Sequence, residues 1–464
     1  MKNRMSLTSC QSILTRIQLP KMKIIASIGL AFLPMLIFAQ ALEELGKQRV
    51  EFEETPGIAI AWVEDGQSHF FSWGFADISH QELVTSKTLF EIGSITKTFT
   101  CSTLSYLVLQ HELALTDQAQ LYLPGTIQLP EKNGKSILLL HLATARSGLP
   151  RLPGNLNPAD PTNPYVDYTE KELTAYLNNC ELPSEPGSKY EYSNLGMGLL
   201  GFLLTHKKNE TYSQLIKEVI LKPLGMNQTF ISGEIKSKLL ATGYVDKNPV
   251  RAWTWSSQSV ITGAGGIVSC TEDMLKYLIA QLATDKSILT TAFHEAHKER
   301  NDAGSESMQI GLGWHIRDHK YVWHNGGTGG FRSFIGFDPE KKRAIVVLTN
   351  STNGADDLGF NWLDKAYELK SMKKTFTLDL SQVKEYEGVY EITPTFKVVV
   401  TSKGTELFVQ ATNQPKVTLY AEETDKFFLK VAEVKIEFAR NTDGKIEKIK
   451  IYQNGIEQVG KKVQ

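Results

Sequence analysis

The alternation of apolar and polar residues predicts β-strands at two widely separated places in the chain. Gly57–Val63 (GIAIAWV) and His69–Phe75 (HFFSWGF) are rich in β-branched and aromatic residues, and the turn residues EDGQ separate them. Three further strand-like runs lie much later, at Tyr321–Gly326, Ser333–Asp338 and Arg343–Asn350. Because the two sets flank a helical region, we expect an α+β domain in which one antiparallel sheet, flanked by helices, encloses a helical subdomain.

Helix-forming sequence lies before, between and after these strands. A helix is expected in ALEELGKQRVEFEET, and a second one begins at Ser94 in FEIGSITKTFTCSTLSYLVLQ. Residues 116–301 mix short helices with loops rich in proline and glycine, and a further helix begins at Asp356. We expect this larger domain to span residues 42–373.

The pattern changes after residue 373. Seven short strand-like segments follow, namely GVYEI, FKVVVTS, ELFVQA, VTLYA, KFFLKV, KIEFAR and KIEKIKIYQ. Turn residues such as Ser402-Lys403-Gly404 separate some of them. Short strands at this spacing predict a small β-sandwich or barrel-like domain over residues 374–464, and no catalytic group stands out in it.

The N-terminal segment has the features of a secretory signal peptide. A short basic stretch precedes the apolar run Ile24–Ala41, which ends in small residues suited to cleavage. The run is too short and too interrupted for a permanent membrane span. We therefore expect residues 1–41 to be a leader, with translation starting at Met1 or Met22, and the protein to be periplasmic or secreted.

The composition narrows the choice of partners and cofactors. The 464 residues carry a formal net charge of -1, which gives no electrostatic basis for binding nucleic acid. Three cysteines remain after the leader, too few and too scattered for a disulfide framework or a zinc site: Cys101, Cys180 and Cys270. Two histidine pairs have a spacing found in metal sites: His294 with His297, and His315 with His319. Without a matching acidic motif we interpret both pairs as surface residues, and we expect no metal and no cofactor.

The strongest chemical signal is the spacing of Ser94 and Lys97. Residues three positions apart are neighbours on a helix, and the surrounding residues are largely apolar. Burial disfavours the charged form of lysine, and a neutral amine beside a hydroxyl group can act as a base that makes the oxygen a nucleophile. A capping serine followed by a solvated lysine is the more common explanation of a lone S-x-x-K, so other motifs must decide.

Three other segments bear on the interpretation of Ser94 and Lys97. PGSKYEYSNLGMGLLG places Tyr192 and Asn194 just before a glycine-rich apolar helix. VWHNGGTGGF places His324, Asn325 and Gly326 at the end of a predicted strand, and GAGGIVSC is a small-residue loop that requires close backbone packing. Singly, each has a structural explanation, as a core tyrosine, a helix cap, a surface histidine or turn glycines.

Together, in this order and spacing, the four segments resemble the serine β-lactamases and penicillin-binding DD-peptidases, specifically their class C-like branch. That branch carries S-x-x-K, then Y-x-N, then a K-T-G or H-x-G strand, and it includes esterases and D-aminopeptidases. The patches TPGIAIAWV, HLATARSGLP and KPLGM fit the same branch. The resemblance covers about Leu42–Glu368 and does not include the C-terminal strands.

The resemblance implies a catalytic role for three side chains. Ser94 would be the nucleophile that is acylated, and Lys97 the base that accepts its proton. Tyr192 would share the proton transfer and help to activate the water that ends the cycle. The backbone N–H groups of Ser94 and Gly327 would form the oxyanion hole, whose glycine lets a backbone donor approach the substrate.

The resemblance also implies a set of substrate-binding residues. Asn194 would bond to Lys97 and to a side-chain amide of the substrate, and the strand triplet His324, Asn325 and Gly326 would contact the substrate directly. The triplet replaces Lys-Thr-Gly, so the usual cation for a substrate carboxylate is altered. Histidine would donate one hydrogen bond without a permanent charge, and Arg332 could supply the missing cation.

The resulting hypothesis is an exported serine hydrolase that cleaves amide bonds of β-lactam or D-alanyl-peptide substrates through an acyl-enzyme on Ser94. A carboxylesterase of the same fold is one alternative, and a penicillin-binding sensor that acylates without turnover is another. The expected partners are small-molecule or peptide substrates, including peptidoglycan fragments. An α/β-hydrolase is excluded because the chain has no G-x-S-x-G motif.

Overall fold

The structure is a computed structural model that describes residues 41–464 apart from 236–237, 256–258, 373–374, 413, 431, 433 and 454–455. The predicted leader lies outside the described residues except for Ala41. Within the described part of the chain, no helix combines the length and the apolar character needed to cross a membrane.

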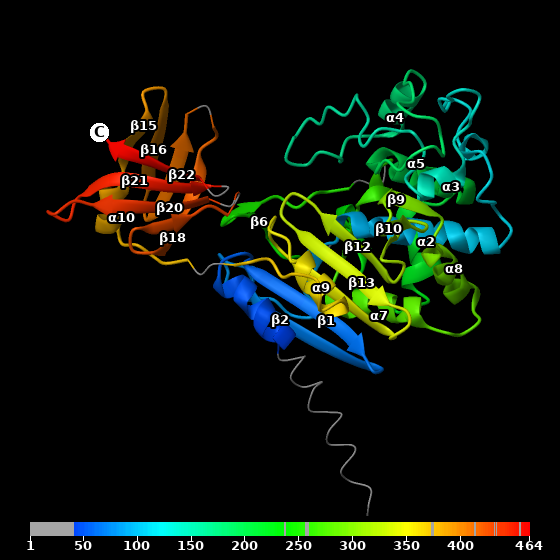
Figure 1. Cartoon of the computed structure of the whole chain (residues 1–464). Helices are drawn as coiled ribbons and strands as arrows, with labels where there is room; N and C mark the ends of the chain where they lie inside the picture. The colour runs from blue at the N-terminus through cyan, green and yellow to red at the C-terminus, as the bar shows by residue number, and fades with distance from the viewer. Residues whose placement is uncertain are drawn as a thin grey trace, which may run out of the picture. The chain divides into compact units, whose positions relative to one another are not determined.

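A nine-stranded antiparallel sheet forms the centre of the larger domain (Figure 1). Its strand order is β3-β2-β1-β14-β13-β12-β11-β10-β9. The strands are β1 (Gly57–Glu64), β2 (Gln67–Asp77), β3 (Glu82–Leu83), β9 (Asn301–Ser305), β10 (Met308–Ile310), β11 (His315–Arg317), β12 (Tyr321–Gly327), β13 (Arg332–Asp338) and β14 (Arg343–Thr349). Strand β1 pairs with β14, with Ile58 opposite Thr349, which confirms the predicted sheet formed by both ends of the domain. Strands β3, β9, β10 and β11 extend this sheet beyond the prediction.

The first hairpin follows directly from its turn residues. Asp65 and Gly66 connect β1 to β2, with φ angles of 50° and 77°. Positive φ at both central positions is typical of a type I′ turn, whose twist matches that of paired strands. Glycine adopts this conformation without steric cost and aspartate tolerates it, so the Asp-Gly turn pairs Val63 with Ser68.

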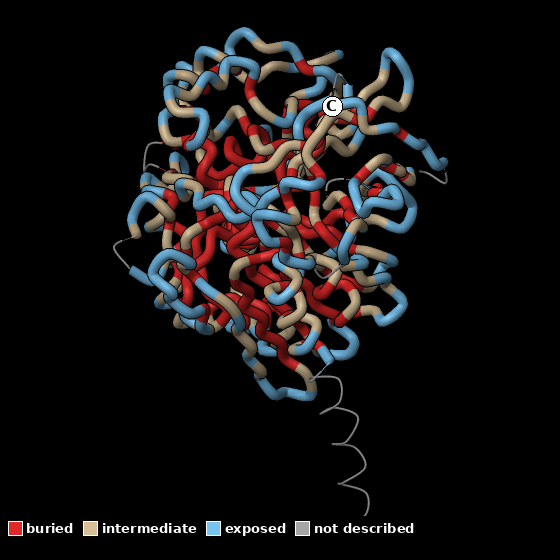
Figure 2. The backbone as a smooth tube through the Cα atoms, turned by 90° about the vertical axis from the view of Figure 1, so that its left-hand side faces the viewer, coloured by how far each residue is buried: buried red, intermediate tan, exposed pale blue. Residues whose placement is uncertain are grey.

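The larger domain contains several helices, one of which is enclosed by the core. They comprise residues 41–51, α2 (Thr96–Leu109), α3 (Leu139–Ala143), α4 (Glu170–Leu177), α5 (Asn194–Lys208), α6 (Tyr212–Ile216), α7 (Thr271–Leu282), α8 (Ile288–His297) and α9 (Asp356–Leu363), with short turns η1 (Gly93–Ile95), η2 (Ala119–Tyr122), η3 (Lys217–Leu221), η4 (Ser232–Glu234) and η5 (Thr262–Ala264). Helix α2 contacts α5, α8 and η5, and most of its residues belong to the buried interior that is red in Figure 2. Apolar residues on every side are typical of a helix enclosed by a core. This enclosure removes Lys97 from water.

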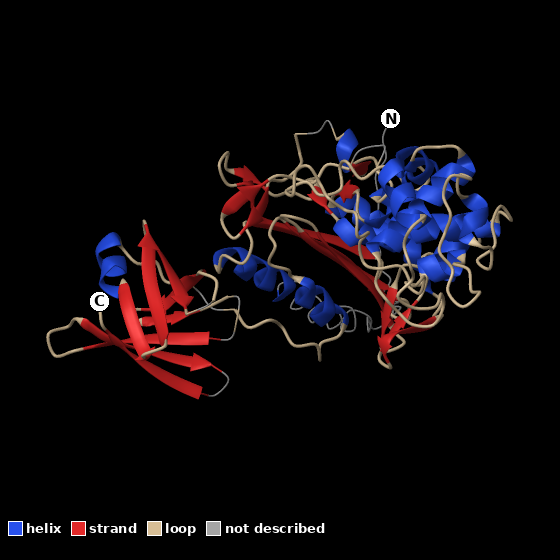
Figure 3. Ribbon diagram, turned by 90° about the horizontal axis from the view of Figure 1, so that it is seen from above, coloured by secondary structure: helices blue, strands red, loops and turns tan. Residues whose placement is uncertain are grey.

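Alternate residues of the central strands face different layers of helices. In β1, Ala61 belongs to the main hydrophobic core, whereas Ile60 lies against Gly46 in the helix that precedes the strand. Helix α7 packs against β1 and β14, and α9 packs against β13 and β14. Figure 3 shows helices on both sides of the sheet. The sheet is thus covered on both faces, which explains the long buried runs in β13 and β14.

The larger domain also contains two small sheets. One has the order β4 (Phe90–Glu91), β8 (Ile267–Ser269), β5 (Phe230–Ile231), and the other pairs β6 (Gly243–Val245) with β7 (Asn248–Val250). Strand β4 leads directly into Ser94, and β8 follows the GAGG segment. Because Phe90 pairs with Ser269, the two motif segments are adjacent.

The C-terminal domain is a closed antiparallel barrel, which confirms the predicted barrel-like domain. Its strands are β15 (Gly388–Thr393), β16 (Phe396–Lys403), β17 (Glu406–Ala411), β18 (Val417–Glu423), β19 (Lys426–Phe428), β20 (Val434–Arg440), β21 (Ile446–Gln453) and β22 (Ile456–Lys462). Helix α10 (Leu380–Tyr386) contributes Val383 and Tyr386 to the barrel core, which is distinct from the core of the larger domain. The sequence did not predict β22, which closes the barrel by pairing with β21 and β15.

Candidate active site

Ser94 and Lys97 meet at the start of the buried helix α2. Ser94 lies in the turn η1, and α2 begins two residues later at Thr96, rather than at Ser94 as the pattern predicts. Lys97 Nζ donates hydrogen bonds to Ser94 Oγ at 2.9 Å and to the Ala264 carbonyl oxygen at 2.6 Å. The amine is therefore within proton-transfer distance of the hydroxyl group.

The surroundings of Lys97 favour its neutral form. The residue is 2% exposed. Burial, assisted by the positive charge of Arg151, holds the pKa of the amine well below its ordinary value. In its neutral form the amine has a lone pair that can accept the Ser94 proton.

Glycine residues allow β12 to approach the turn that carries Ser94. Gly93 has a φ of 50°, and a Cβ at this position would lie 2.7 Å from the Gly327 nitrogen. A Cβ on Gly326 would overlap the Ile92 carbonyl oxygen. The two backbone segments that the resemblance assigns to the oxyanion hole are therefore in contact.

Tyr192 joins this group from the start of α5. Ser193 caps the helix by accepting a hydrogen bond from a backbone N–H of the first turn at 2.8 Å. The Tyr192 ring centre lies 4.9 Å from Lys97 Nζ and 5.1 Å from the guanidinium carbon of Arg151. Burial raises the pKa of the Tyr192 phenol, and a hydrogen bond with Ser94 offsets part of the effect. Tyr192 therefore remains a neutral phenol that can donate and relay a proton.

Asn194 lies in the cavity wall, but it does not form the hydrogen bond with Lys97 that the resemblance implies. The Ala264 carbonyl oxygen occupies the position on Lys97 that the resemblance gave to the asparagine. Asn194 Oδ1 is buried and has no hydrogen-bond partner among the described residues, and Tyr165 is its neighbour. A buried acceptor without a partner is suited to a donor from a substrate, such as an amide N–H.

The structure does not support the expected direct contact between His324 and the substrate. Its side chain is 2% exposed and lies beside the Tyr192 ring, with Nδ1 2.6 Å from the Asn325 carbonyl oxygen. Burial, followed by the charges of His315 and Lys97, holds the pKa of His324 well below its ordinary value. Successive strand residues face opposite sides, so Asn325 lines the cavity and the neutral, enclosed His324 does not. We assign no contact with the substrate charge to His324.

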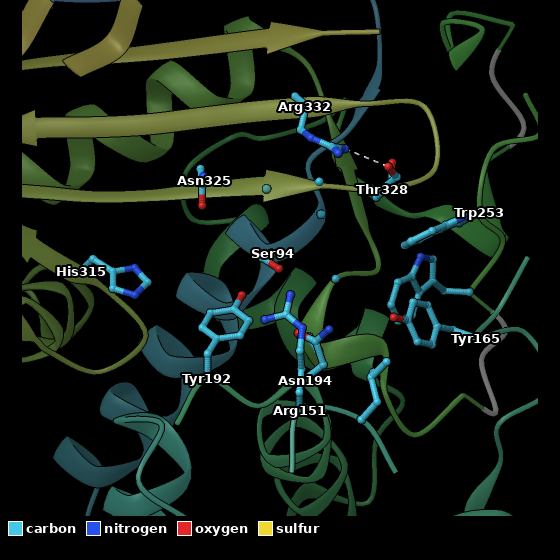
Figure 4. Close-up of a pocket in the computed structure, with 17 residues that line it drawn as sticks. Ser94, Arg151, Tyr165, Tyr192, Asn194, Trp253, His315, Asn325, Thr328 and Arg332 are labelled. Carbon is cyan, nitrogen blue, oxygen red and sulfur yellow. Dashed lines mark hydrogen bonds between the residues drawn. The ribbon is translucent and has the colours of Figure 1, made fainter. Parts of the chain in front are cut away.

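The group opens into a cavity of about 550 Å³ (Figure 4), a size typical of small-molecule sites. Six residues selected from the sequence lie in its wall: Ser94, Tyr192, Asn194, Asn325, Gly326 and Gly327. Two arginines and three aromatic residues complete much of the rest: Arg151, Arg332, Tyr165, Trp253 and Trp255. Tyr165 stacks on Trp255 at 4.7 Å and meets Trp253 edge-on at 5.3 Å, which gives the cavity one aromatic side.

A buried carboxyl group lies behind this wall. Glu91 of β4 is 3% exposed, and by geometry neither of its oxygens forms a hydrogen bond with a described residue. Burial raises the pKa of Glu91 to about 7, although Thr328 and the Trp253 backbone lie near enough to lower it slightly. Glu91 therefore changes its charge near neutral pH, next to two cavity residues.

A second buried carboxyl group holds Asn325. The Asn325 Nδ2 donates a hydrogen bond to Asp356 Oδ2 at 2.6 Å. Burial raises the pKa of Asp356 to about 6, and the Asn325 bond and the Arg332 charge limit the rise. The carboxyl group at the start of α9 thus orients the amide that faces the cavity.

The two histidine pairs are not equivalent. His294 and His319 are exposed, as the sequence analysis expects. His315, by contrast, is buried in the cavity wall, and His297 is half-buried with Nε2 2.6 Å from Gln281 Oε1. The surface interpretation is therefore wrong for these two residues. In the described part of the chain, no group of three or more His, Cys, Asp or Glu is placed to hold a metal ion.

Comparison with known proteins places this arrangement in a family. The family profile described as Beta-lactamase matches residues 40–369, a range that contains every residue of the site. The chain belongs to the beta-lactamase family. A second profile, described as Domain of unknown function (DUF3471), matches residues 373–462.

Similar members of the beta-lactamase family have names that indicate two activities. A beta-lactamase of Escherichia coli (strain K12) is 28% identical over 341 residues, which are 65% of this chain and 85% of that protein. The D-alanyl-D-alanine-carboxypeptidase/endopeptidase AmpH of the same strain is 28% identical over 314 residues, 64% of this chain and 80% of that protein.

Solved structures of the family resemble this one in fold. The octameric penicillin-binding protein homologue from Pyrococcus abyssi has a TM-score of 0.63 and 25% identity, and the match covers 91% of this chain and 99% of that one. A class C beta-lactamase has a TM-score of 0.61 and 23% identity, with 72% and 97% covered. As a member of the beta-lactamase family, the chain is a serine hydrolase.

Sequence reasoning missed several residues of the site because they lie in loops without a periodic pattern. Arg151 follows the family patch HLATARSGLP directly, so its position gave a weak signal. Glu91 lies within the same short stretch as Ser94, and an acid between apolar residues of a strand was a usable signal. Trp253 and Trp255 had no signal beyond the concentration of aromatic residues in one loop.

Proposed function

We propose that the protein is an exported serine hydrolase that cleaves amide bonds of the β-lactam or D-alanyl-peptide type through an acyl-enzyme on Ser94. The observation that carries the proposal is the 2.9 Å contact between Ser94 Oγ and Nζ of the buried Lys97. The names of two similar proteins, a beta-lactamase and a D-alanyl-D-alanine-carboxypeptidase/endopeptidase, support the substrate class.

Acylation requires one new bond, the loss of another, and three proton transfers. Ser94 Oγ attacks the carbonyl carbon, and the Ser94 proton passes to Lys97 Nζ. The carbonyl oxygen becomes an oxyanion, for which the N–H groups of Ser94 and Gly327 are the proposed donors. As the C–N bond breaks, the leaving nitrogen takes the phenol proton of Tyr192, and Tyr192 recovers a proton from Lys97.

Deacylation reverses these roles with water as the nucleophile. The Tyr192–Lys97 pair takes a proton from the water while the water oxygen attacks the ester carbon. The bond between that carbon and Ser94 Oγ then breaks, Ser94 regains its proton, and a carboxylic acid leaves. Because Tyr192 is a neutral phenol that contacts both partners, it suits a relay better than a permanent anion.

A carboxylesterase is the second candidate, since the same steps on an ester release an alcohol. The specific observation in its favour is that β12 offers no cation to a substrate carboxylate, because His324 is enclosed and neutral. A sensor that is acylated without turnover is the third candidate. The presence of both Lys97 and Tyr192, which the proposed deacylation uses, argues against it.

The test combines two probes with intact-protein mass measurement. A fluorescent penicillin should label the peptide that contains Ser94, and the label should disappear as turnover proceeds. Turnover of a short-chain nitrophenyl ester without any penicillin labelling would favour the esterase, and a stable label would favour the sensor. Ser94→Ala should abolish all labelling; label on another residue would contradict the assignment.

Export rests on the sequence of residues 1–41, and peptidoglycan fragments are the substrates that an exported enzyme of this kind would meet. N-terminal analysis of the protein purified from cell envelopes should find a chain that begins near residue 42. A full-length protein in the cytoplasm would contradict the proposal.

A further inference from the structure

We propose that the preferred substrate carries a negatively charged group on each side of the carbonyl that Ser94 attacks. The inference rests on the proposed function and adds a charge pattern to the substrate. Two guanidinium groups in the cavity wall carry it, those of Arg151 and Arg332, and Ser94 lies between them in Figure 4.

Arg332 is held on the sheet side of the cavity. It lies opposite Gly327 in the pairing of β13 with β12. Its Nη1 donates hydrogen bonds to the carbonyl oxygens of Thr328 at 3.0 Å and Phe331 at 2.9 Å. Neither Nε nor Nη2 donates a hydrogen bond to a residue in the described ranges, so one edge of the fork remains for a carboxylate.

Arg151 lies on the other side of Ser94, next to the start of α5. Its guanidinium carbon is 5.1 Å from the Tyr192 ring centre, and its backbone carbonyl accepts a hydrogen bond from the Asn194 nitrogen at 2.9 Å. The residue is exposed and forms no ion pair with any described residue. Its charge is therefore available at the mouth of the cavity.

The acidic groups nearby do not neutralise both arginines. None of the described residues in the wall is an aspartate or a glutamate. The negative charge of Asp356 acts on Arg332, but this carboxyl group is hydrogen-bonded to Asn325. Glu91 is buried next to Thr328 and is not part of the wall. The charged side chains of the described wall are both positive, and a cleft lined by one sign of charge concentrates ions of the opposite sign.

The aromatic residues of the wall suit an aromatic or other apolar group of the substrate. Tyr165 and Trp253 lie to one side of Ser94 in Figure 4, and Trp255 stacks on Tyr165. The substrate class is therefore an acyl compound with an aromatic or other apolar acyl group, a carboxylate beyond that group, and a second carboxylate on the leaving group. Either half alone would leave one guanidinium without its partner.

Four matched depsipeptides test the inference, because an ester bond reports acylation of Ser94 whether or not amides are preferred. All share one aromatic acyl group, and they carry a carboxylate on the acyl side, on the leaving side, on both sides or on neither. In the wild type, kcat/KM for the dianionic compound should exceed that for the neutral one by about tenfold or more. Added salt should reduce this ratio, since part of the attraction acts through solvent.

Two variants locate the effect, and a third controls for general charge. Arg151→Gln and Arg332→Gln should each lower the dianionic-to-neutral ratio by about fivefold, and each should remove the advantage of a different carboxylate. The ratio within one variant cancels any change in the shared Lys97 base. Arg251→Gln removes an exposed arginine that pairs with Asp160 outside the wall, and it should leave the ratio unchanged.

The outcomes separate this inference from the proposed function. If Ser94 is acylated and all four compounds react equally well, or if both arginine variants leave the ratio unchanged, the charge pattern is wrong and the hydrolase remains. If neither the depsipeptides nor a fluorescent penicillin acylates Ser94, the proposed function fails and the inference fails with it.

Discussion

Lys97 can act as a base only while it is uncharged, which makes its substitution a direct test. Lys97→Ala should fold and should lower the acylation rate by about 10²- to 10⁴-fold. Lys97→Arg should be no better, because a guanidinium stays protonated. Stopped-flow acylation measures both, with the exposed Lys87→Ala as the control. Rates near wild type in Lys97→Arg would show that another group takes the Ser94 proton.

The same residue sets the pH dependence of the reaction. The pKa of Lys97 is lowered by burial, so activity should be present at neutral pH and should fall as the pH drops through that lowered pKa. The enclosed His324 should add no rise of kcat/KM on the acid side for carboxylate substrates. The fall that follows protonation of Lys97 should therefore appear in the profiles of both a neutral and an anionic substrate.

Glu91 should make the protein less stable as the pH rises. Its pKa is about 7 in the folded protein and 4.5 for an unperturbed glutamate, as in the unfolded chain. Between these pH values the folded protein therefore binds more protons than the unfolded chain. The free energy of unfolding should therefore fall across this window, by on the order of 3 kcal/mol in total. Glu91→Gln should remove this slope and raise stability above about pH 7.

Denaturant unfolding at about pH 5 and about pH 8 measures the effect of Glu91. Glu82→Gln, the same change at an exposed position of β3, is the control and should keep the slope. An identical pH dependence in Glu91→Gln and in the wild type would mean that other groups dominate.

The roles of single residues were predictable only where a motif fixes the local geometry. The Ser94–Lys97 contact follows from their three-residue spacing and the start of α5 from its capping serine, whereas the packing of α5 on α2 brings Tyr192 to this pair. His324 and Asn325 are neighbours in sequence, yet the register of β12 decides which of them faces the cavity. Burial in the folded state, which the sequence does not show, makes His324 neutral.

At the scale of elements, the contact between α5 and the η5 segment positions the acceptor of Lys97. A Cβ on Gly198 would lie 2.7 Å from Ile261 Cα, so Gly198→Ala must push this segment away. The helix-propensity gain of about 1 kcal/mol is smaller than the overpacking cost of about 1–3 kcal/mol. We expect lower stability and reduced turnover, because Ala264 follows Ile261 and holds Lys97.

Thermal unfolding and steady-state kinetics of Gly198→Ala test this expectation. Gly125→Ala is the matched control, since a Cβ there meets nothing within 4 Å and the variant should behave as the wild type. Normal turnover in Gly198→Ala would show that the segment moves without disturbing the Lys97 acceptor.

Elements with strong alternation or a defined turn were predictable, and polar or short ones were not. The β1–β2 hairpin combines apolar strands with an Asp-Gly turn, and its bounds agree with the pattern to within two residues. The last barrel strand, Ile456–Lys462, is mostly polar and exposed. Its partners β15 and β21 determine its structure, and pairing of this kind leaves little periodicity in the sequence.

At the scale of the whole molecule, the two hydrophobic cores predict two independent folding units. The barrel has its own closed set of strands and its own core, and it contributes none of the described residues of the cavity wall. A chain that ends at Met372 should therefore unfold cooperatively and turn over small substrates at the wild-type rate. Calorimetry and kinetics measure both properties. Loss of turnover with an intact thermal transition would show that the barrel shapes the site.

The pairing of β1 with β14 also constrains when the enzyme can become active. The first strand of the sheet leaves the ribosome long before its partner, because the entire helical subdomain is synthesised between them. Until Arg343–Thr349 has been synthesised, one edge of β1 is unpaired and the sheet that the core packs against is incomplete. Pairings between distant segments also close slowly. Ser94 and Lys97 therefore reach their active geometry only after the segment Arg343–Thr349 has been synthesised.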